Sequence, residues 1–146
     1  MAAITASIEI DAPPEEVFDY LSQLDKHDEW QTSIKSIEVL TAGETRVGSR
    51  AREVREAGGR DQTITYEMTE VDRPQVAAFK GVDGPVRPFG RVLLTPLDGG
   101  ARTRYDFEFD FETVGLTGKM FGGIARRQAQ KEIPEDLSRL KAKLES

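Results

Sequence analysis

A strip of eight residues from Tyr105 to Glu112 constrains the fold more than any other feature of the chain. Its aromatic members, which alternate with four carboxylates, are Tyr105, Phe107, Phe109 and Phe111. Because successive side chains of a β-strand point to opposite faces of a sheet, this period predicts a strand with a buried aromatic face and a wet acidic face. The strip directly precedes the longest helical pattern, residues 116 to 144, so a helix is available to cover the aromatic face.

The preceding segments predict further strands and short helices. Alternating apolar residues indicate a strand over residues 4 to 10, and Pro13-Pro14-Glu15-Glu16 indicates a helix start, because proline fits the first turn and carboxylates favour the positive end of the helix dipole. A short helical turn at residues 25 to 30 leads to a strand at 34 to 40. Glycine-containing turns then separate strands expected at 47 to 56, 62 to 72, 75 to 82, 86 to 96 and 101 to 112. The prediction is an α+β fold with seven antiparallel strands and two short helices between the first and second strands.

The C-terminal segment has one apolar stripe at helical spacing, which predicts a single buried helix face. Its members are Leu116, Met120, Phe121, Ile124, Ala125, Ala129, Ile133, Leu137, Leu140 and Leu144. Four glycines in the first half should make that half looser, and Pro134 should kink the second half. The glycines have two interpretations: a gate that admits a ligand, or close contact between helix and sheet.

Composition narrows the class of protein. A chain of 146 residues suits one domain, residues 1–146, that buries roughly 70% of its unfolded surface. No apolar run approaches the roughly 20 residues of a membrane span. The N-terminal residues lack the basic and apolar regions of a secretory signal, so we expect the protein to be cytoplasmic.

The inventory of reactive residues is short. The chain has no cysteine and a single histidine, so we expect no metal and no cofactor. His27 lies among the charged residues Asp25, Lys26, Asp28 and Glu29, which favours a solvated turn. A net charge of −6 argues against nucleic acid as a partner, because affinity for phosphate backbones comes mainly from lysine and arginine.

The order of these elements resembles the START / polyketide cyclase-dehydrase superfamily, also called SRPBCC, whose members have the helix-grip fold. The segments that carry the resemblance are Ile8-Glu9-Ile10-Asp11-Ala12-Pro13-Pro14-Glu15-Glu16-Val17-Phe18, Trp30, Val47-Gly48, Thr95-Pro96, Gly99-Gly100-Ala101-Arg102, Leu140-Lys141 and Glu145. The resemblance covers nearly the whole chain. It implies a curved seven-stranded sheet wrapped around the long C-terminal helix, with an apolar cavity between them for a lipid, polyketide or isoprenoid-like molecule. It implies no catalytic motif, because the superfamily shares a cavity rather than a set of reactive residues.

The residues point to the same kind of cavity, because large aromatic side chains on the strip face glycines and an adaptable methionine on the helix. Tyr66 shares a strand face with Ile64, Met68 and Glu70, and is either a donor to the ligand or a core tyrosine bonded to backbone. Core packing is the competing role for every aromatic residue here, Trp30 included. The candidate ligand-binding residues are Trp30, Ile64, Tyr66, Met68, Phe79, Tyr105, Phe107, Phe109, Met120, Phe121 and Ile124.

Three functions are compatible with this sequence. The favoured one is a non-catalytic carrier or sensor of a hydrophobic small molecule, which needs only a cavity. The second is a polyketide cyclase or dehydratase, which needs an acid or base held inside the cavity with a pKa shifted by burial. No recognisable catalytic constellation is present. The third is a protein-interaction module, like the chaperone activators of the superfamily, which needs an exposed apolar patch.

Overall fold

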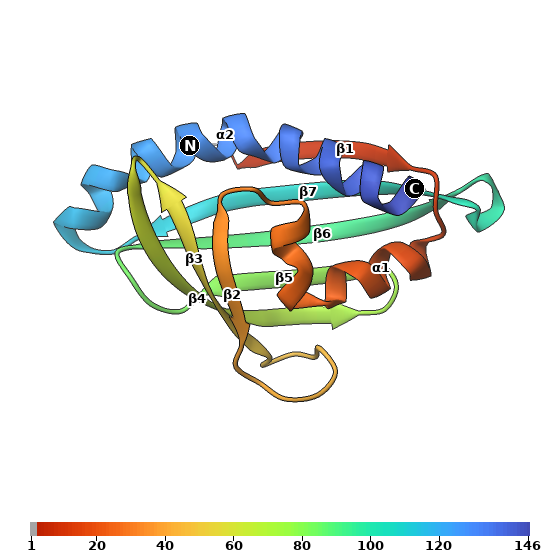
Figure 1. The fold of residues 1–146 in the computed structure, drawn as a ribbon, viewed down its shortest axis with the longest axis horizontal. Coiled ribbons are helices and arrows are strands. Elements are labelled where there is room, and N and C mark those ends of the chain that lie inside the picture. Colours follow the sequence, from red (N-terminus) through yellow and green to blue (C-terminus); the bar gives the residue numbers. More distant parts are fainter. Residues whose placement is uncertain (1–2) are drawn as a thin grey trace.

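The central element of the computed structural model, which describes residues 3–146, is one sheet of seven antiparallel strands (Figure 1). The strands are β1 (Ile4–Ile10), β2 (Ile34–Val39), β3 (Arg50–Ala57), β4 (Arg60–Asp72), β5 (Val76–Gly81), β6 (Val86–Leu97) and β7 (Arg102–Thr113). Their order is β1-β7-β6-β5-β4-β3-β2, and every neighbouring pair is antiparallel. The predicted α+β class, the number of strands and the helix-grip architecture are confirmed.

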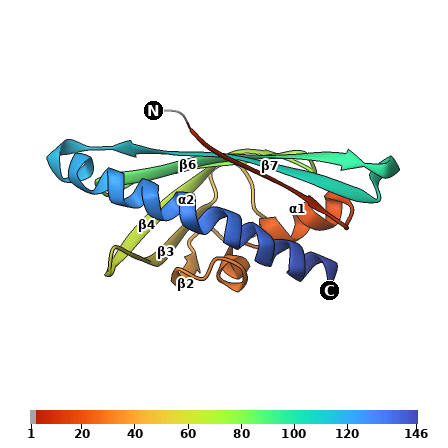
Figure 2. The same ribbon diagram turned by 90° about the horizontal axis from the view of Figure 1, so that it is seen from above.

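The helices lie where the chain leaves the sheet. The first α-helix, α1 (Pro14–Ser22), and the 3-10 helix η1 (Leu24–Glu29) connect β1 to β2, as predicted, and a 3-10 turn, η2 (Asp98–Gly100), joins β6 to β7. The long C-terminal helix α2 (Gly115–Glu145) runs across one face of the sheet (Figure 2). Pro134 lies inside α2, which continues beyond it to Glu145. No helix within residues 3–146 is both long and apolar enough to cross a membrane.

The tight turns between strands follow from residues that tolerate a positive φ. Gly58 and Gly59, with φ of +61° and +77°, close the hairpin between β3 and β4. The turn between β6 and β7 contains Asp98, Gly99 and Gly100, all with positive φ. Glycine adopts this conformation without the steric cost that a Cβ imposes, so these positions fix where the strands reverse direction.

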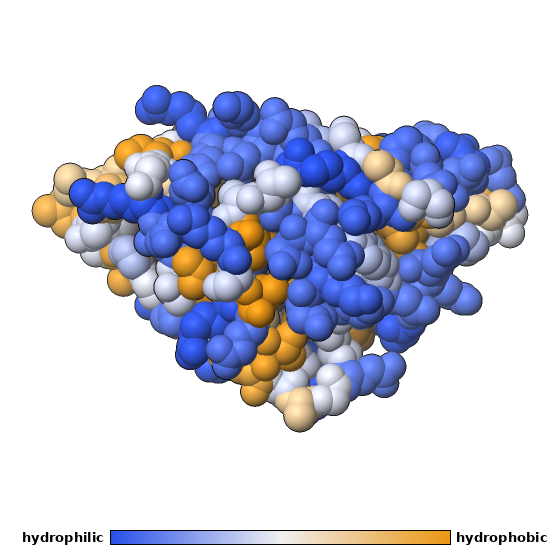
Figure 3. Space-filling model, viewed as in Figure 1, coloured by the Kyte–Doolittle hydropathy of each residue, from blue (hydrophilic) through white to orange (hydrophobic). Residues whose placement is uncertain are grey.

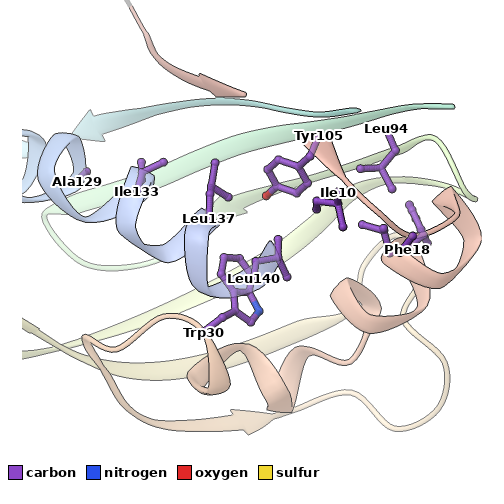
Figure 4. Packing of buried hydrophobic residues seen from close by; sticks show 11 residues of the cluster. Ile10, Phe18, Trp30, Leu94, Tyr105, Ala129, Ile133, Leu137 and Leu140 are labelled. Atoms are coloured by element: carbon purple, nitrogen blue, oxygen red, sulfur yellow. The ribbon is translucent and has the colours of Figure 1, made fainter. Parts of the chain in front are cut away.

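The core lies between the sheet and the second half of α2. Ile133, Leu137 and Leu140 of α2 are buried there, and in Figure 4 they turn toward Tyr105 of β7 and toward Trp30, which follows η1. At the far end of the same cluster, Ile10, Val17, Phe18 and Leu94 join β1, α1 and β6. Burying this much apolar surface is the main term that holds the helix against the sheet.

The first half of α2 departs from the predicted buried stripe. Leu116, Met120 and Ile124 are 77%, 67% and 46% exposed, and hydrophobic residues gather at the end of the molecule where α2 begins (Figure 3). In this half, two glycines come closest to the end of the sheet. Gly118 packs against the Pro85 carbonyl, and Gly122 packs against Thr113. The glycines therefore allow close contact between the helix and the end of the sheet, the second of their two interpretations.

Candidate functional site

A cavity of about 200 Å³ lies between the sheet and α2. Its walls come from η1, from strands β3 to β7 and from the middle of α2, including Ala125, Ala129 and Ile133. Alanine at two successive turns of the helix leaves room opposite the large side chains of the sheet. Small residues that face large ones across two layers are the arrangement that can keep an interior space open.

Aromatic rings of the sheet form the floor of this cavity. Phe107, Phe109 and Phe111 project from β7 toward the cavity. The ring centre of Phe109 lies 5.5 Å from that of Phe107 and 4.9 Å from that of Phe111. Phe79 of β5 lies 6.3 Å from Phe109 and 5.6 Å from Tyr66 of β4. The predicted alternation of the strip thus places its aromatic residues on the cavity side.

The aromatic floor depends on Gly90, a residue of β6 that the sequence did not single out. A Cβ at this position would lie 2.9 Å from ring carbons of both Phe107 and Phe79. The absence of a side chain on β6 therefore lets the two rings from neighbouring strands lie over its backbone. A glycine inside a strand pattern, flanked by strands with aromatic residues, is the signal that could have indicated this contact.

The predicted binding residues divide into three groups. The first group lines the main cavity: Trp30, Ile64, Tyr66, Met68, Phe79, Tyr105, Phe107 and Phe109. Phe121 and Ile124 line a second cavity of about 120 Å³. This smaller cavity adjoins the first, since Ala57, Gln62, Val86 and Ala125 belong to both walls. Met120 lines neither cavity and is mostly exposed.

Two charged residues of β3, Glu53 and Arg55, lie in the cavity wall, although the sequence analysis did not select them. The Arg55 guanidinium donates to Glu53 at 3.0 Å, to Ser33 Oγ at 2.9 Å and to Gln31 Oε1 at 2.5 Å. The surrounding run, Arg52 to Glu56, is highly charged and is typical of a solvated strand. The inward period of β3 starts at the fully buried Ala51, and counting by two from there would have placed both residues inside.

An acidic residue of α2, Asp136, also contributes to the cavity wall and is only 6% exposed. Arg139 donates to its carboxylate at 2.5 Å and also donates to the Trp30 carbonyl at 3.0 Å. Burial raises the pKa of Asp136, and the nearby Arg139 opposes that shift only in part. The pKa of the Tyr105 hydroxyl is also raised, chiefly by burial and secondarily by Asp136.

His27 contradicts the expectation of a solvated turn residue, because its ring lines the cavity. The ring nitrogen Nε2 lies 2.8 Å from the Leu21 carbonyl oxygen; since a carbonyl only accepts, Nε2 is the protonated nitrogen. Burial lowers the pKa of His27. In a 3-10 helix, residues three apart lie on the same side, so His27 and Trp30 both face inward, with ring centres 5.5 Å apart. The charged neighbours of His27 point outward.

Two polar atoms in the cavity wall have no hydrogen-bond partner within residues 3–146: the Tyr66 hydroxyl and Trp30 Nε1. Both side chains are 6% exposed. The alternative in which Tyr66 is a core residue bonded to backbone is therefore wrong. Most buried polar groups in proteins are paired, so these two are exceptions that require a physical explanation.

Glu70 does not share the inward face of Tyr66 as the alternation of β4 predicts. The pairing of β4 with β5 shifts between Met68 and Glu70, and this bulge turns the Glu70 side chain to the outer surface. There its carboxylate accepts from Arg91 of β6 at 3.0 Å. Within residues 3–146, no three His, Cys, Asp or Glu side chains are close enough together to hold a metal ion.

Comparisons with known proteins agree with this architecture. A protein of Thermus thermophilus superimposes with a TM-score of 0.79 and 21% identity, over 97% of this chain and 96% of that chain. The Zhui aromatase/cyclase of a Streptomyces species has a TM-score of 0.79 and 17% identity, over 98% of this chain and 93% of that chain. A START superfamily protein of Mycobacterium smegmatis has a TM-score of 0.77 and 16% identity, over 99% of this chain and 98% of that chain. At these identities the likeness shows a shared fold.

No curated protein sequence matches this chain significantly. The family model described as polyketide cyclase / dehydrase and lipid transport matches residues 1–145, which is nearly the whole sequence. The chain therefore belongs to the polyketide cyclase / dehydrase and lipid transport family.

Proposed function

We propose that this protein binds a hydrophobic small molecule, such as a lipid or a polyketide, in the internal cavity and acts as its carrier or sensor. The observation that carries the proposal is the cavity between α2 and the aromatic floor of the sheet. Most of its wall is aromatic or aliphatic, and an apolar ligand that enters it gains the free energy of leaving water. Family membership supports the same class of ligand.

The size of the cavity sets the size of the ligand. An apolar cavity of roughly 150 Å³ in another protein holds benzene, so about 200 Å³ suits a molecule of one or two rings or a short folded chain. The adjoining 120 Å³ cavity, lined by Phe121 and Ile124, offers a direction in which a longer ligand extends. This second space lies under the glycine-rich first half of α2, where the helix is least covered by other elements.

Native mass spectrometry of protein purified from its own host tests the proposal. We expect a co-purified apolar molecule that denaturation releases. A matched pair of variants locates it: Ala129→Phe places a ring in the cavity, whereas Gln130→Phe adds the same ring at an exposed position of the same helix. The ligand should be lost from Ala129→Phe and retained by Gln130→Phe. Equal retention by both folded variants would refute binding in this cavity.

A polyketide cyclase or dehydratase is the second candidate function, and the polar residues of the cavity wall favour it. Asp136 and His27 both line the cavity and have pKa values shifted by burial, as an internal acid or base requires. Incubation with a linear poly-β-ketone, followed by mass spectrometry, detects loss of water from the substrate. Turnover by the wild-type protein that Asp136→Asn abolishes would support an enzyme, whereas binding without turnover supports the carrier.

A further inference from the structure

The two unpaired donors of the cavity wall belong to side chains at the same end of the cavity. The Trp30 ring lies 5.5 Å from His27, and Glu53 and Arg55 act electrostatically on both His27 and Tyr66. Leu24 of η1 packs in one buried cluster with Tyr66. The end of the cavity formed by η1, β3 and β4, here called the donor end, thus includes the side chains of both Trp30 and Tyr66.

The chemistry of these groups defines what they can bind. Indole Nε1 only donates, and a tyrosine hydroxyl has one hydrogen to donate, so the group that satisfies them is a hydrogen-bond acceptor. Leaving them unpaired in a buried site is costly, and an acceptor on a ligand removes that cost. Both side chains line the cavity, so an occupant of the cavity is within their reach.

Building on the cavity binding proposed above, we propose that the donor end recognises a neutral acceptor oxygen, such as that of a ketone or quinone, carried by a ring-shaped apolar ligand. The aromatic floor takes the rings of this ligand, and the acceptor oxygen faces Trp30 and Tyr66. The protein thereby distinguishes carbonyl compounds from plain hydrocarbons of the same shape.

Charge at the donor end excludes an ionised ligand. Glu53 and Asp136 place two buried carboxylates in the wall. Arg55, the arginine of that wall, already donates to Glu53, Gln31 and Ser33. Glu53 raises the pKa of Tyr66 and Arg55 lowers it, so the positive charge of Arg55 already has a negative partner at this end of the cavity. A free carboxylate would lose its hydration here without gaining an unengaged cation.

Three probes of similar shape test this inference by isothermal titration calorimetry: 2-acetylnaphthalene, 2-isopropylnaphthalene and 2-naphthoate. The ketone should bind roughly fivefold to tenfold more tightly than the hydrocarbon, the gain expected from about one net hydrogen bond, and the anion should bind most weakly. Tyr66→Phe should reduce the preference for the ketone, so that the affinities for the ketone and the hydrocarbon become more nearly equal. Tyr20→Phe is the matched control, because the Tyr20 hydroxyl donates to Glu29 outside the cavity wall, and it should leave all three affinities unchanged.

A second measurement does not depend on how the variants fold. Trp30 is the single tryptophan of the chain, so its indole N–H gives one resonance in a ¹⁵N-labelled sample. The ketone should shift this resonance downfield, and the hydrocarbon should not. Equal affinity for ketone and hydrocarbon with no such shift would overturn the inference while leaving cavity binding intact. Tightest binding of naphthoate would overturn the neutral class, and failure of all three probes to bind would overturn cavity binding as well.

Discussion

Gly118→Ala should destabilise the protein, although alanine is the better helix former. An added Cβ would lie 2.3 Å from the Pro85 carbonyl oxygen, a contact with backbone that only a displacement of the helix or the loop can relieve. The same carbonyl accepts from the Val114 amide at 2.8 Å, so the displacement also weakens the hydrogen bond that precedes α2.

The magnitude follows from three contributions. Overpacking costs about 1 to 3 kcal/mol. The weakened hydrogen bond costs about 0.5 to 1.5 kcal/mol. The higher helix propensity of alanine offsets this loss by up to ~1 kcal/mol. The net loss is about 2 kcal/mol, which lowers the Tm of a domain of this size by roughly 4 to 8 °C.

Urea denaturation followed by circular dichroism measures this loss, and Gly123→Ala is the control. A Cβ at Gly123 meets nothing within 4 Å, so this variant should gain about 0.4 to 1 kcal/mol from the reduced freedom of the unfolded chain. The test is whether the two variants change the free energy of unfolding in opposite directions. If Gly118→Ala is as stable as Gly123→Ala, the first half of α2 is not held against the Pro85 loop and the packing role of its glycines is refuted.

Two further predictions concern the cavity wall. Phe107→Ala should lower the free energy of unfolding by less than ~3 kcal/mol, because the Phe107 ring borders the cavity and is only half-buried. Leu94 is packed on all sides, so Leu94→Ala should lower it by about 3 to 5 kcal/mol. Equal losses in urea denaturation would indicate a solid core. Burial lowers the pKa of His27 below its usual 6.5, so the unfolded chain takes up the proton first as pH falls, and stability should decline below about pH 6.5. His27→Gln should remove this part of the pH dependence, and an unchanged stability profile would contradict the burial of the ring.

The fold was predictable because its signals are local and repeated. The aromatic strip fixed the inward face of β7, and turn residues such as Gly58 and Gly59 fixed where the strands reverse. Each signal needs only a period or a backbone conformation, which a single sequence contains. The resemblance to the superfamily, now supported by the family match, added the placement of α2 on the sheet.

The site was predictable only in its apolar part. Glu53 and Arg55 lie in a charged run that is typical of a solvated strand, and their burial depends on partners from other elements, Gln31 and Ser33. The sequence analysis therefore did not select either residue as a candidate. His27 was misplaced for a similar reason, because the backbone of η1, not the charge of its neighbours, decides which way the ring points.

The predictions for Glu70 and for the start of α2 were wrong for the same reason, because a local period shows which residues share a face but not how far that face stays covered. Alternation assigns a face correctly only while the strand register continues, and the shift after Met68 breaks it. Helical spacing likewise shows which residues share a face, but not how far the sheet extends beneath that face. Leu116 and Met120 belong to the stripe and lie beyond the part that the sheet covers.

The most direct test of the central claim, binding inside the cavity, is a ¹H–¹⁵N NMR titration of the protein with 2-acetylnaphthalene. The account predicts that shift changes concentrate on residues around the cavity, namely the aromatic floor of β7, the inward positions of β3 and β4, the Trp30 indole and the turn of α2 near Ala129. The exposed residues Leu116 and Met120 should change little. Shifts confined to that exposed end of α2, with the Trp30 indole and β7 unaffected, would show that the ligand binds the surface and would contradict the account.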